Sequence, residues 1–161
     1  MLTAATPAED GRTLIVTRTL KAPRELVWKM FSDPYHLAQW WGPKGFTNRV
    51  ETFAFRTGGK WLHVMIGQDG RELPTDNDIV EVTPPRRIVF RNAPTDPRIF
   101  GDNPPPGFTK TLTFDAVEGG TLLKLVCVFD TPEHKDAVVR RGFRDGTNES
   151  FDKLEAQLAT L

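Results

Sequence analysis

Residues 131–161 read TPEHKDAVVRRGFRDGTNESFDKLEAQLATL, and this stretch decides the fold. One set of positions recurs with the 3.6-residue period of a helix, in steps of four, four, three, four and three residues. The set comprises Phe143, Thr147, Phe151, Leu154, Leu158 and Leu161. Thr131 comes just before Pro132, and threonine is a common N-cap residue. The pattern predicts a long C-terminal helix over about 132–159 with one continuous stripe.

Two glycines interrupt this predicted helix, Gly142 and Gly146, one turn apart. Each costs roughly 1 kcal/mol relative to alanine in a helix interior. One explanation is that they leave space for the sheet, a neighbour or a ligand. The other is a helix break between 140 and 147. The sequence leaves both explanations open.

Upstream of residue 131 the pattern changes to the two-residue period of β-strands. A strand is predicted at 12–20, followed by two short helices, the second with Asp33 as N-cap. A β-meander then extends to Asp130, with a tight hairpin at Asp69-Gly70. An antiparallel sheet needs a cover on its apolar face, which the C-terminal helix can supply. We therefore expect an α+β fold in which a curved antiparallel sheet of about six to seven strands surrounds that helix.

Length and composition favour one domain over 12–161, preceded by a flexible tail over 1–11. The Pro-rich stretch 93–107 predicts a long loop, and loops of this length often act as lids.

The net charge is zero, so we expect no nucleic-acid partner. No apolar run is long enough for a bilayer, and the N-terminus lacks a secretory signal. We expect no membrane association and a cytoplasmic location, with the single Cys127 as a buried structural thiol.

Several stretches resemble a known family: LIVTRTLKAPRELVWKMFSDPYHLAQWWGPKGFT at 14–47, GGKW at 58–61, QDG at 68–70, VEVTPPRRIVF at 80–90 and GGTLLKL at 119–125. They resemble bacterial proteins named for the C-terminal domain of the activator of heat shock protein 90 ATPase. That family belongs to the START-like (SRPBCC, Bet v 1-like) helix-grip superfamily. The resemblance implies a helix-grip fold with a cavity between helix and sheet, often used for apolar ligands. The family's name implies a chaperone partner. Thr147 and His63 depart from the family, which usually has large or aromatic residues at these positions, so we expect a larger and wetter space here.

The predicted ligand-binding residues are Trp40, Trp61, His63, Met65, Phe90, Phe143 and Thr147. Trp61, His63 and Met65 alternate along one strand and therefore share its inward face. Phe90 alternates with charged residues, and Phe143 and Thr147 belong to the helix stripe. Trp40 is placed at the cavity mouth, with Trp41 packed under the following Gly-Pro turn. The alternative is that both tryptophans are core residues.

His63 must find a hydrogen-bond partner if it is buried. It is either a ligand contact or proton carrier, or a core histidine bonded to a backbone carbonyl. On the opposite face of the same strand, Leu62, Val64 and Ile66 form an outer strip that is unusually apolar. We expect this strip to be covered by the N-terminal segment or by a second copy in a homodimer.

The three histidines, His36, His63 and His134, lack metal-ligand spacing, and no nucleophile motif or phosphate loop appears. We expect no metal, no cofactor and no catalytic residue. The leading prediction is non-enzymatic binding of a small, largely apolar molecule. The alternatives are a chaperone-associated interaction protein, or a cyclase- or hydrolase-like enzyme that uses His63 with a carboxylate such as Glu81. A bulge would decide which face Glu81 takes.

Overall fold

A computed structural model describes residues 11–92 and 106–161. The predicted tail over 1–11 and the predicted loop over 93–107 lie almost entirely outside these residues. Within them the strands form one antiparallel sheet in the order β1-β7-β6-β5-β4-β3-β2. The strands are β1 (Thr13–Leu20), β2 (Thr47–Phe53), β3 (Lys60–Ile66), β4 (Glu72–Thr83), β5 (Arg87–Asn92), β6 (Phe108–Val117) and β7 (Gly120–Phe129). The prediction of a six- to seven-stranded antiparallel sheet is confirmed.

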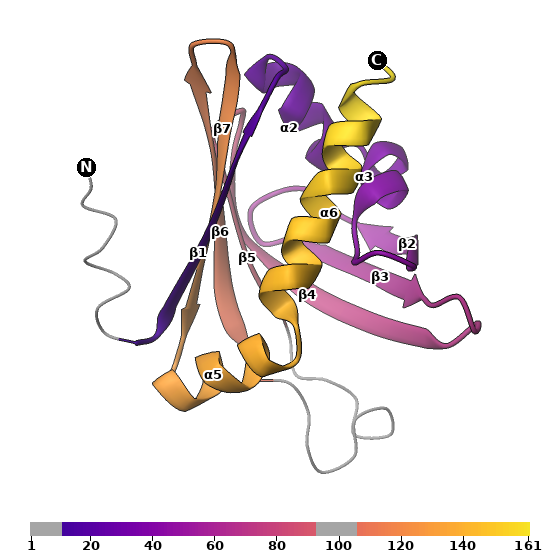
Figure 1. The fold of residues 1–161 in the computed structure, drawn as a ribbon, viewed down its shortest axis with the longest axis vertical. Coiled ribbons are helices and arrows are strands. Elements are labelled where there is room, and N and C mark those ends of the chain that lie inside the picture. Colours follow the sequence, from indigo (N-terminus) through magenta and orange to yellow (C-terminus); the bar gives the residue numbers. More distant parts are fainter. Residues whose placement is uncertain (1–10, 93–105) are drawn as a thin grey trace.

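Helices cover one side of this sheet (Figure 1). They are α2 (Arg24–Ser32), α3 (Pro34–Trp40), α5 (Pro132–Arg140) and α6 (Phe143–Leu158). The helix α6 crosses the sheet, with α2 and α3 beside its C-terminal half and α5 at its N-terminal end. The helix-grip arrangement and the two short helices after the first strand are confirmed.

The C-terminal helical segment is two helices, so the prediction of a single helix over 132–159 is wrong. The break lies at Arg141 and Gly142, between α5 and α6. Gly142 has φ 91°, a left-handed conformation that glycine adopts without steric cost. No atom lies within 4 Å of where its Cβ would be, so this glycine serves the backbone conformation and not close packing. The predicted N-cap is confirmed, because the Thr131 side chain accepts a hydrogen bond from the backbone of His134 at 3.1 Å.

The core is rich in aromatic rings between the sheet and the two short helices. Trp28 and Phe31 of α2 both contact Phe114 of β6 edge to face, with ring centroids 5.0 Å apart in each pair. Phe114 itself is fully buried. Such pairs add roughly 0.5–1.5 kcal/mol beyond burial of their area. They fix α2 against β6.

Arg18 ties β1, at one edge of the sheet, to α6. Its guanidinium donates to Asp152 at 3.0 Å, to Glu155, and to the backbone carbonyl of Asn148 at 3.3 Å. Arg18 is itself half-buried, whereas both carboxylates are more exposed. Exposed ion pairs contribute little individually, so this contact orients α6 more than it stabilises the fold.

The outer strip of β3 is partly covered within the chain itself. Val64 is only 3% exposed, and Leu62 and Ile66 are half-buried. The homodimer stays a prediction.

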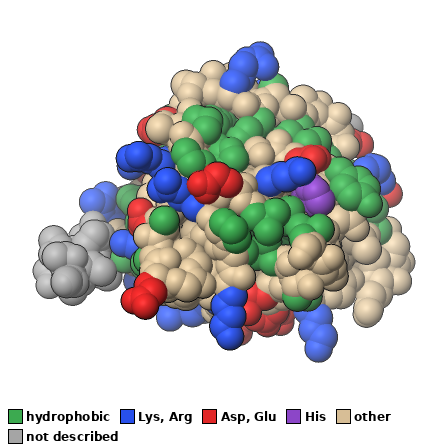
Figure 2. Space-filling model, turned by 90° about the horizontal axis from the view of Figure 1, so that it is seen from above, with side chains coloured by type: hydrophobic (Ala, Val, Ile, Leu, Met, Phe, Trp, Pro, Cys, Tyr) green, Lys and Arg blue, Asp and Glu red, His purple; other side chains and the backbone are tan. Residues whose placement is uncertain are grey.

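On the face shown in Figure 2, hydrophobic side chains are interspersed with charged groups of both signs. None of the described helices is long and apolar enough to cross a membrane.

Candidate functional site

The main cavity, of about 850 Å³, lies between the middle of the sheet and the α5–α6 segment. Its walls come from strands β2 to β7, from the turn after α3, from α5, and from the first half of α6. Apolar lining residues include Trp41, Met65, Leu73, Phe90, Phe108, Val138 and Phe143. Polar lining residues include His63, Asn77, Asn92, Lys110, Thr147 and Ser150. The cavity thus combines an apolar wall with polar groups, and its lining also includes the charged residues Glu51, Asp76, Arg141, Asp145 and Glu149.

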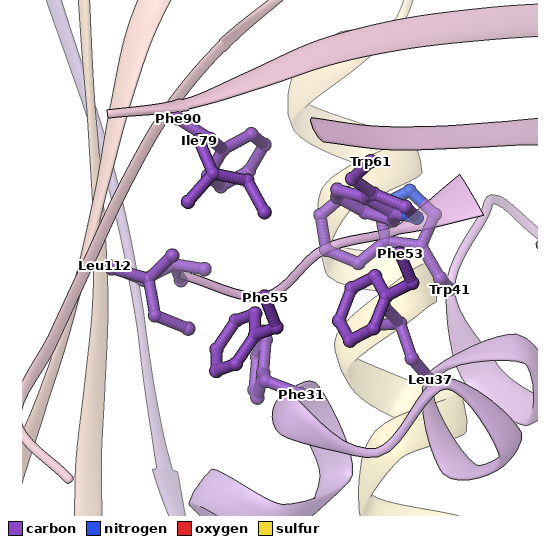
Figure 3. Close-up of a pocket in the computed structure, with 10 residues that line it drawn as sticks. Phe31, Leu37, Trp41, Phe53, Phe55, Trp61, Ile79, Phe90 and Leu112 are labelled. Carbon is purple, nitrogen blue, oxygen red and sulfur yellow. The ribbon is translucent and has the colours of Figure 1, made fainter. Parts of the chain in front are cut away.

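A second, much smaller space of about 20 Å³ lies between the sheet and helices α2 and α3. We call it the aromatic void, because rings from several elements point into it (Figure 3). Its volume corresponds to about one water, and its lining offers no polar partner to hold one. Trp41, Phe90 and Leu112 line both spaces and form the wall between them.

The two adjacent tryptophans do not take the positions that the sequence predicted. Trp40 is fully buried, and its indole N–H donates to the carbonyl of Met30 at 3.0 Å. Among the described residues that line the two spaces, Trp40 does not occur, so it does not lie at the cavity mouth as predicted. Trp41 lines both spaces and meets Trp61 edge to face at 4.7 Å. The cause is local: Trp40 is the last residue of α3, whereas Trp41 already has extended backbone angles that turn its ring toward the sheet.

The turn that follows Trp41 is held by α6. The N–H of Gly42 donates to the Ser150 hydroxyl at 3.2 Å, and the N–H of Lys44 donates to Glu149 at 3.0 Å. The Lys153 ammonium donates to the carbonyls of Gly42 and Phe46, both at 3.1 Å. These bonds fix one wall of the main cavity, because the turn and α6 both line it.

Gly146 lies where α6 passes this turn. A Cβ at Gly146 would lie 3.5 Å from the Cβ of Pro43, which is ordinary contact. A side chain at this position would therefore fit against the turn. Of the two explanations left open for the glycines, the helix break holds for Gly142, whereas Gly146 lines the main cavity without a contact that excludes a Cβ.

His63 points inward with Trp61 and Met65, as the alternation predicts. Its ring stacks on Trp61 with centroids 4.4 Å apart, and its Nδ1 lies 2.9 Å from Oδ1 of Asn48 on the neighbouring strand. Burial, together with the nearby charge of Lys110, lowers the pKa of His63 to about 3. The ring is therefore neutral near pH 7. With Asn48 Oδ1 accepting, the Nδ1 carries the proton and the Nε2 keeps its lone pair.

The structure brings five of the seven predicted residues to the main cavity: His63, Met65, Phe90, Phe143 and Thr147. Trp61 lines only the aromatic void, and Trp40 lies in the core. Ligand contact by these residues stays a prediction.

Glu81 does not partner His63. The β4 strand shifts register between Ile79 and Glu81. The Glu81 carboxylate instead accepts from the hydroxyl of Thr83 at 2.7 Å and pairs with Arg87 at 3.3 Å. The predicted pairing of His63 with Glu81 is wrong, because the bulge sends this carboxylate away from the cavity.

Sequence reasoning missed Lys110, a buried lysine that lines the main cavity and is 8% exposed. Its ammonium lies 4.1 Å from the ring centroid of Phe108 and 5.0 Å from that of Phe90. It donates to Oδ1 of Asn92 at 3.3 Å. Burial lowers the pKa of Lys110 to about 8, with a smaller raising effect from Cys127 and a lowering effect from Arg91. The signal was available in the alternation of Phe108, Lys110 and Leu112, which puts all three side chains on one face.

Cys127 is paired with Lys110 in the sheet register and is fully buried. Burial raises the pKa of the Cys127 thiol to about 12, against a lowering effect from Lys110. The thiol is therefore protonated near pH 7, as expected for a structural cysteine.

Among residues 11–92 and 106–161, no group of three or more His, Cys, Asp or Glu side chains is placed to hold a metal ion.

Comparison with protein families matches residues 21–159 to the model described as activator of Hsp90 ATPase homolog 1-like protein. No curated protein matches the chain. Among solved structures, a Mycobacterium smegmatis protein is 27% identical with a TM-score of 0.81, covering 94% of this chain and 93% of its own. A Nitrosomonas europaea protein is 25% identical with a TM-score of 0.79, covering 93% and 96%. An Arthrobacter aurescens protein, 22% identical with a TM-score of 0.84 over 94% and 88%, supports the fold alone.

Proposed function

The chain belongs to the family of activator of Hsp90 ATPase homolog 1-like proteins, and on this premise we propose that it binds a small, largely apolar molecule in the main cavity. Proteins with this START-like fold commonly bind ligands between the sheet and the C-terminal helix. The proposal assigns no chemical step to the protein.

The observation that carries the proposal is the size of the main cavity combined with its lining. Small-molecule sites typically enclose roughly 300–1,000 Å³ and combine apolar walls with a few polar groups. The main cavity, at about 850 Å³, lies within this range. Its apolar lining comes from the sheet and the helices alike, which suits a ligand enclosed between the two layers.

The walls are also held in place before any ligand arrives. The hydrogen bonds from Gly42 and Lys44 to α6 fix the turn, and Trp41 is held against Trp61 and Phe90. A preformed site avoids the entropic cost of ordering its walls on binding. This arrangement supports a binding function more than a purely structural role for the cavity.

The test is a titration with N-phenyl-1-naphthylamine, a neutral apolar dye whose fluorescence rises in apolar surroundings. We expect the protein to bind the dye and Thr147→Trp to weaken binding, because the added ring fills part of the cavity. Ala156→Trp is the matched control, since Ala156 is exposed on the same helix. Thr147→Trp should also keep or raise thermal stability, because packed surface replaces a void.

Absence of dye binding by the native protein would refute the proposal. Equal binding by a folded Thr147→Trp variant would place the site elsewhere. Unfolding of this variant would mean that Thr147 is already closely packed.

A chaperone partner, which the family's name suggests, receives less support from the described surface. The exposed large hydrophobic residues of residues 11–92 and 106–161 are Tyr35, Val80, Val117, Val128 and Leu161. They belong to different elements of the fold. Docking to a chaperone would also leave the main cavity without a role.

A further inference from the structure

Lys110 places a single ammonium group against the main cavity, deep in the molecule. An ammonium has three donors, and the hydrogen bonds of the described residues use only one, to Asn92 at 3.3 Å. The faces of Phe90 and Phe108 supply the remaining favourable contacts. Buried charges in proteins are normally paired and fully hydrogen-bonded, and this one is only partly satisfied.

No carboxylate of the described residues lies within 4 Å of this ammonium. The titratable groups that act on it are Cys127 on β7, Arg91 on β5 and His63 on β3. The thiol and the imidazole are neutral near pH 7, and Arg91 is a cation, so none of them neutralises Lys110.

Four acidic residues line other parts of the main cavity, and the fourth, Asp145, lies in the first turn of α6. The other three have partners among the described residues. Glu51 pairs with Arg49, Asp76 pairs with Lys60 at 2.5 Å, and Glu149 accepts from the backbone of Lys44. These three carboxylates belong to local contacts. The counter-ion of Lys110 is therefore missing from the described part of the chain.

We propose that the ligand is an amphipathic monocarboxylate, with its carboxylate bound by Lys110 and its apolar body along the walls of the main cavity. A carboxylate supplies one negative charge, which matches the single ammonium of Lys110, the only lysine among the described lining residues. The apolar body would lie against Met65, Phe108 and Phe143, which line the same cavity. This inference rests on the proposed function and adds the chemical class of the ligand.

The test compares two ligands that share one chain, dodecanoate and dodecan-1-ol, as competitors of N-phenyl-1-naphthylamine below their aggregation limits. In Lys110→Met we expect dodecanoate to bind about tenfold or more weakly, since hydrogen bonds to charged groups contribute roughly this much. Dodecan-1-ol should change by less than about twofold in the same variant. Lys124→Met is the matched control, because it removes one positive charge from an outward position of β7 and should leave both competitors unchanged.

Equal losses for both competitors, or no loss for either, would overturn the carboxylate site while leaving the proposed function intact. Failure of the native protein to bind the dye would overturn the proposed function and this inference with it. Lys110→Gln repeats the comparison if Lys110→Met does not fold. If neither variant folds, carboxyl-labelled [1-¹³C]dodecanoate is titrated on the native protein. A bound carboxyl pKa below that of the free acid supports pairing with Lys110, and an unchanged or raised pKa overturns it.

Discussion

Replacing Lys110 by methionine should stabilise the protein, although it removes a hydrogen bond and two cation–ring contacts. Burial lowers the pKa of Lys110 from 10.5 to about 8, so the folded state holds the charged form at a cost. Each pKa unit corresponds to about 1.4 kcal/mol. The shift therefore represents roughly 3 kcal/mol of lost stability near pH 7, which methionine would largely recover.

The pH dependence of this gain has a definite sign. The folded-state pKa of Lys110 lies below the unfolded-state value, so the unfolded chain binds more protons between about pH 8 and 10.5. The native protein therefore gains stability as pH rises through this window, and the penalty is fully present below about pH 8. The advantage of Lys110→Met should fall from roughly 3 kcal/mol near pH 7 to roughly 1.4 kcal/mol near pH 9.5.

The assay is urea unfolding at several pH values, with Lys124→Met as the control for loss of one surface charge. A gain of this size corresponds to a rise in Tm of about 6–12 °C for a domain of this length. A variant less stable than the native protein near pH 7, or a gain that does not shrink with rising pH, would refute the assignment of Lys110 as a buried, poorly paired cation.

Three further predictions concern His63, Arg18 and the binding of dodecanoate. Between about pH 7.5 and 5 the native protein should lose about 2 kcal/mol of stability through His63, because the unfolded chain takes up the proton while the folded-state pKa is near 3. His63→Phe should abolish this loss, and urea unfolding that shows equal acid sensitivity in both proteins would contradict this. Arg18→Met should cost about 1 kcal/mol or less, and high salt should reduce the difference; a large, salt-independent loss would mean that packing dominates. In dye displacement, the affinity for dodecanoate should decline as pH rises above about 8, because Lys110 loses its proton. The affinity for dodecan-1-ol should not change over the same range.

Features set by local periodicity were predictable from the sequence. Alternation along β3 correctly placed Trp61, His63 and Met65 on the inward face, because successive side chains of a strand point to opposite sides. Asp33 and Thr131 cap helices as expected, since capping depends on a few adjacent residues. The order of elements and the sheet around a terminal helix followed from these local signals together with the family resemblance.

Features that depend on a single backbone angle or on cross-strand register were not predictable. The stripe through Phe143 continues the helical period across the break, so only the positive φ of Gly142 reveals two helices. Trp40 lies in the core and Trp41 lines the main cavity because α3 ends between them. Asn48 partners His63 through the pairing of β2 with β3, which no local pattern specifies.

Lys110 was missed for a different reason. A lysine in a strand is normally assigned to the solvent face, because lysine is rarely buried. The alternation with Phe108 and Leu112 indicates the opposite, and here the alternation is correct. A charged residue at an inward position of an otherwise apolar strand face is thus a useful signal of a candidate site.

The central claim, that a ligand enters the main cavity, can be tested most directly through the methionine methyl groups. The chain has three methionines: Met65 lines the main cavity, Met30 is fully buried in the core, and Met1 lies outside the described residues. A protein labelled with [ε-¹³C]methionine is titrated with N-phenyl-1-naphthylamine, whose rings shift the resonances of nearby methyls, and Met30→Leu and Met65→Leu assign the signals. We predict a saturable shift of the Met65 methyl with little change at Met30. A shift confined to Met30, or no saturable shift at either methionine, would contradict the account.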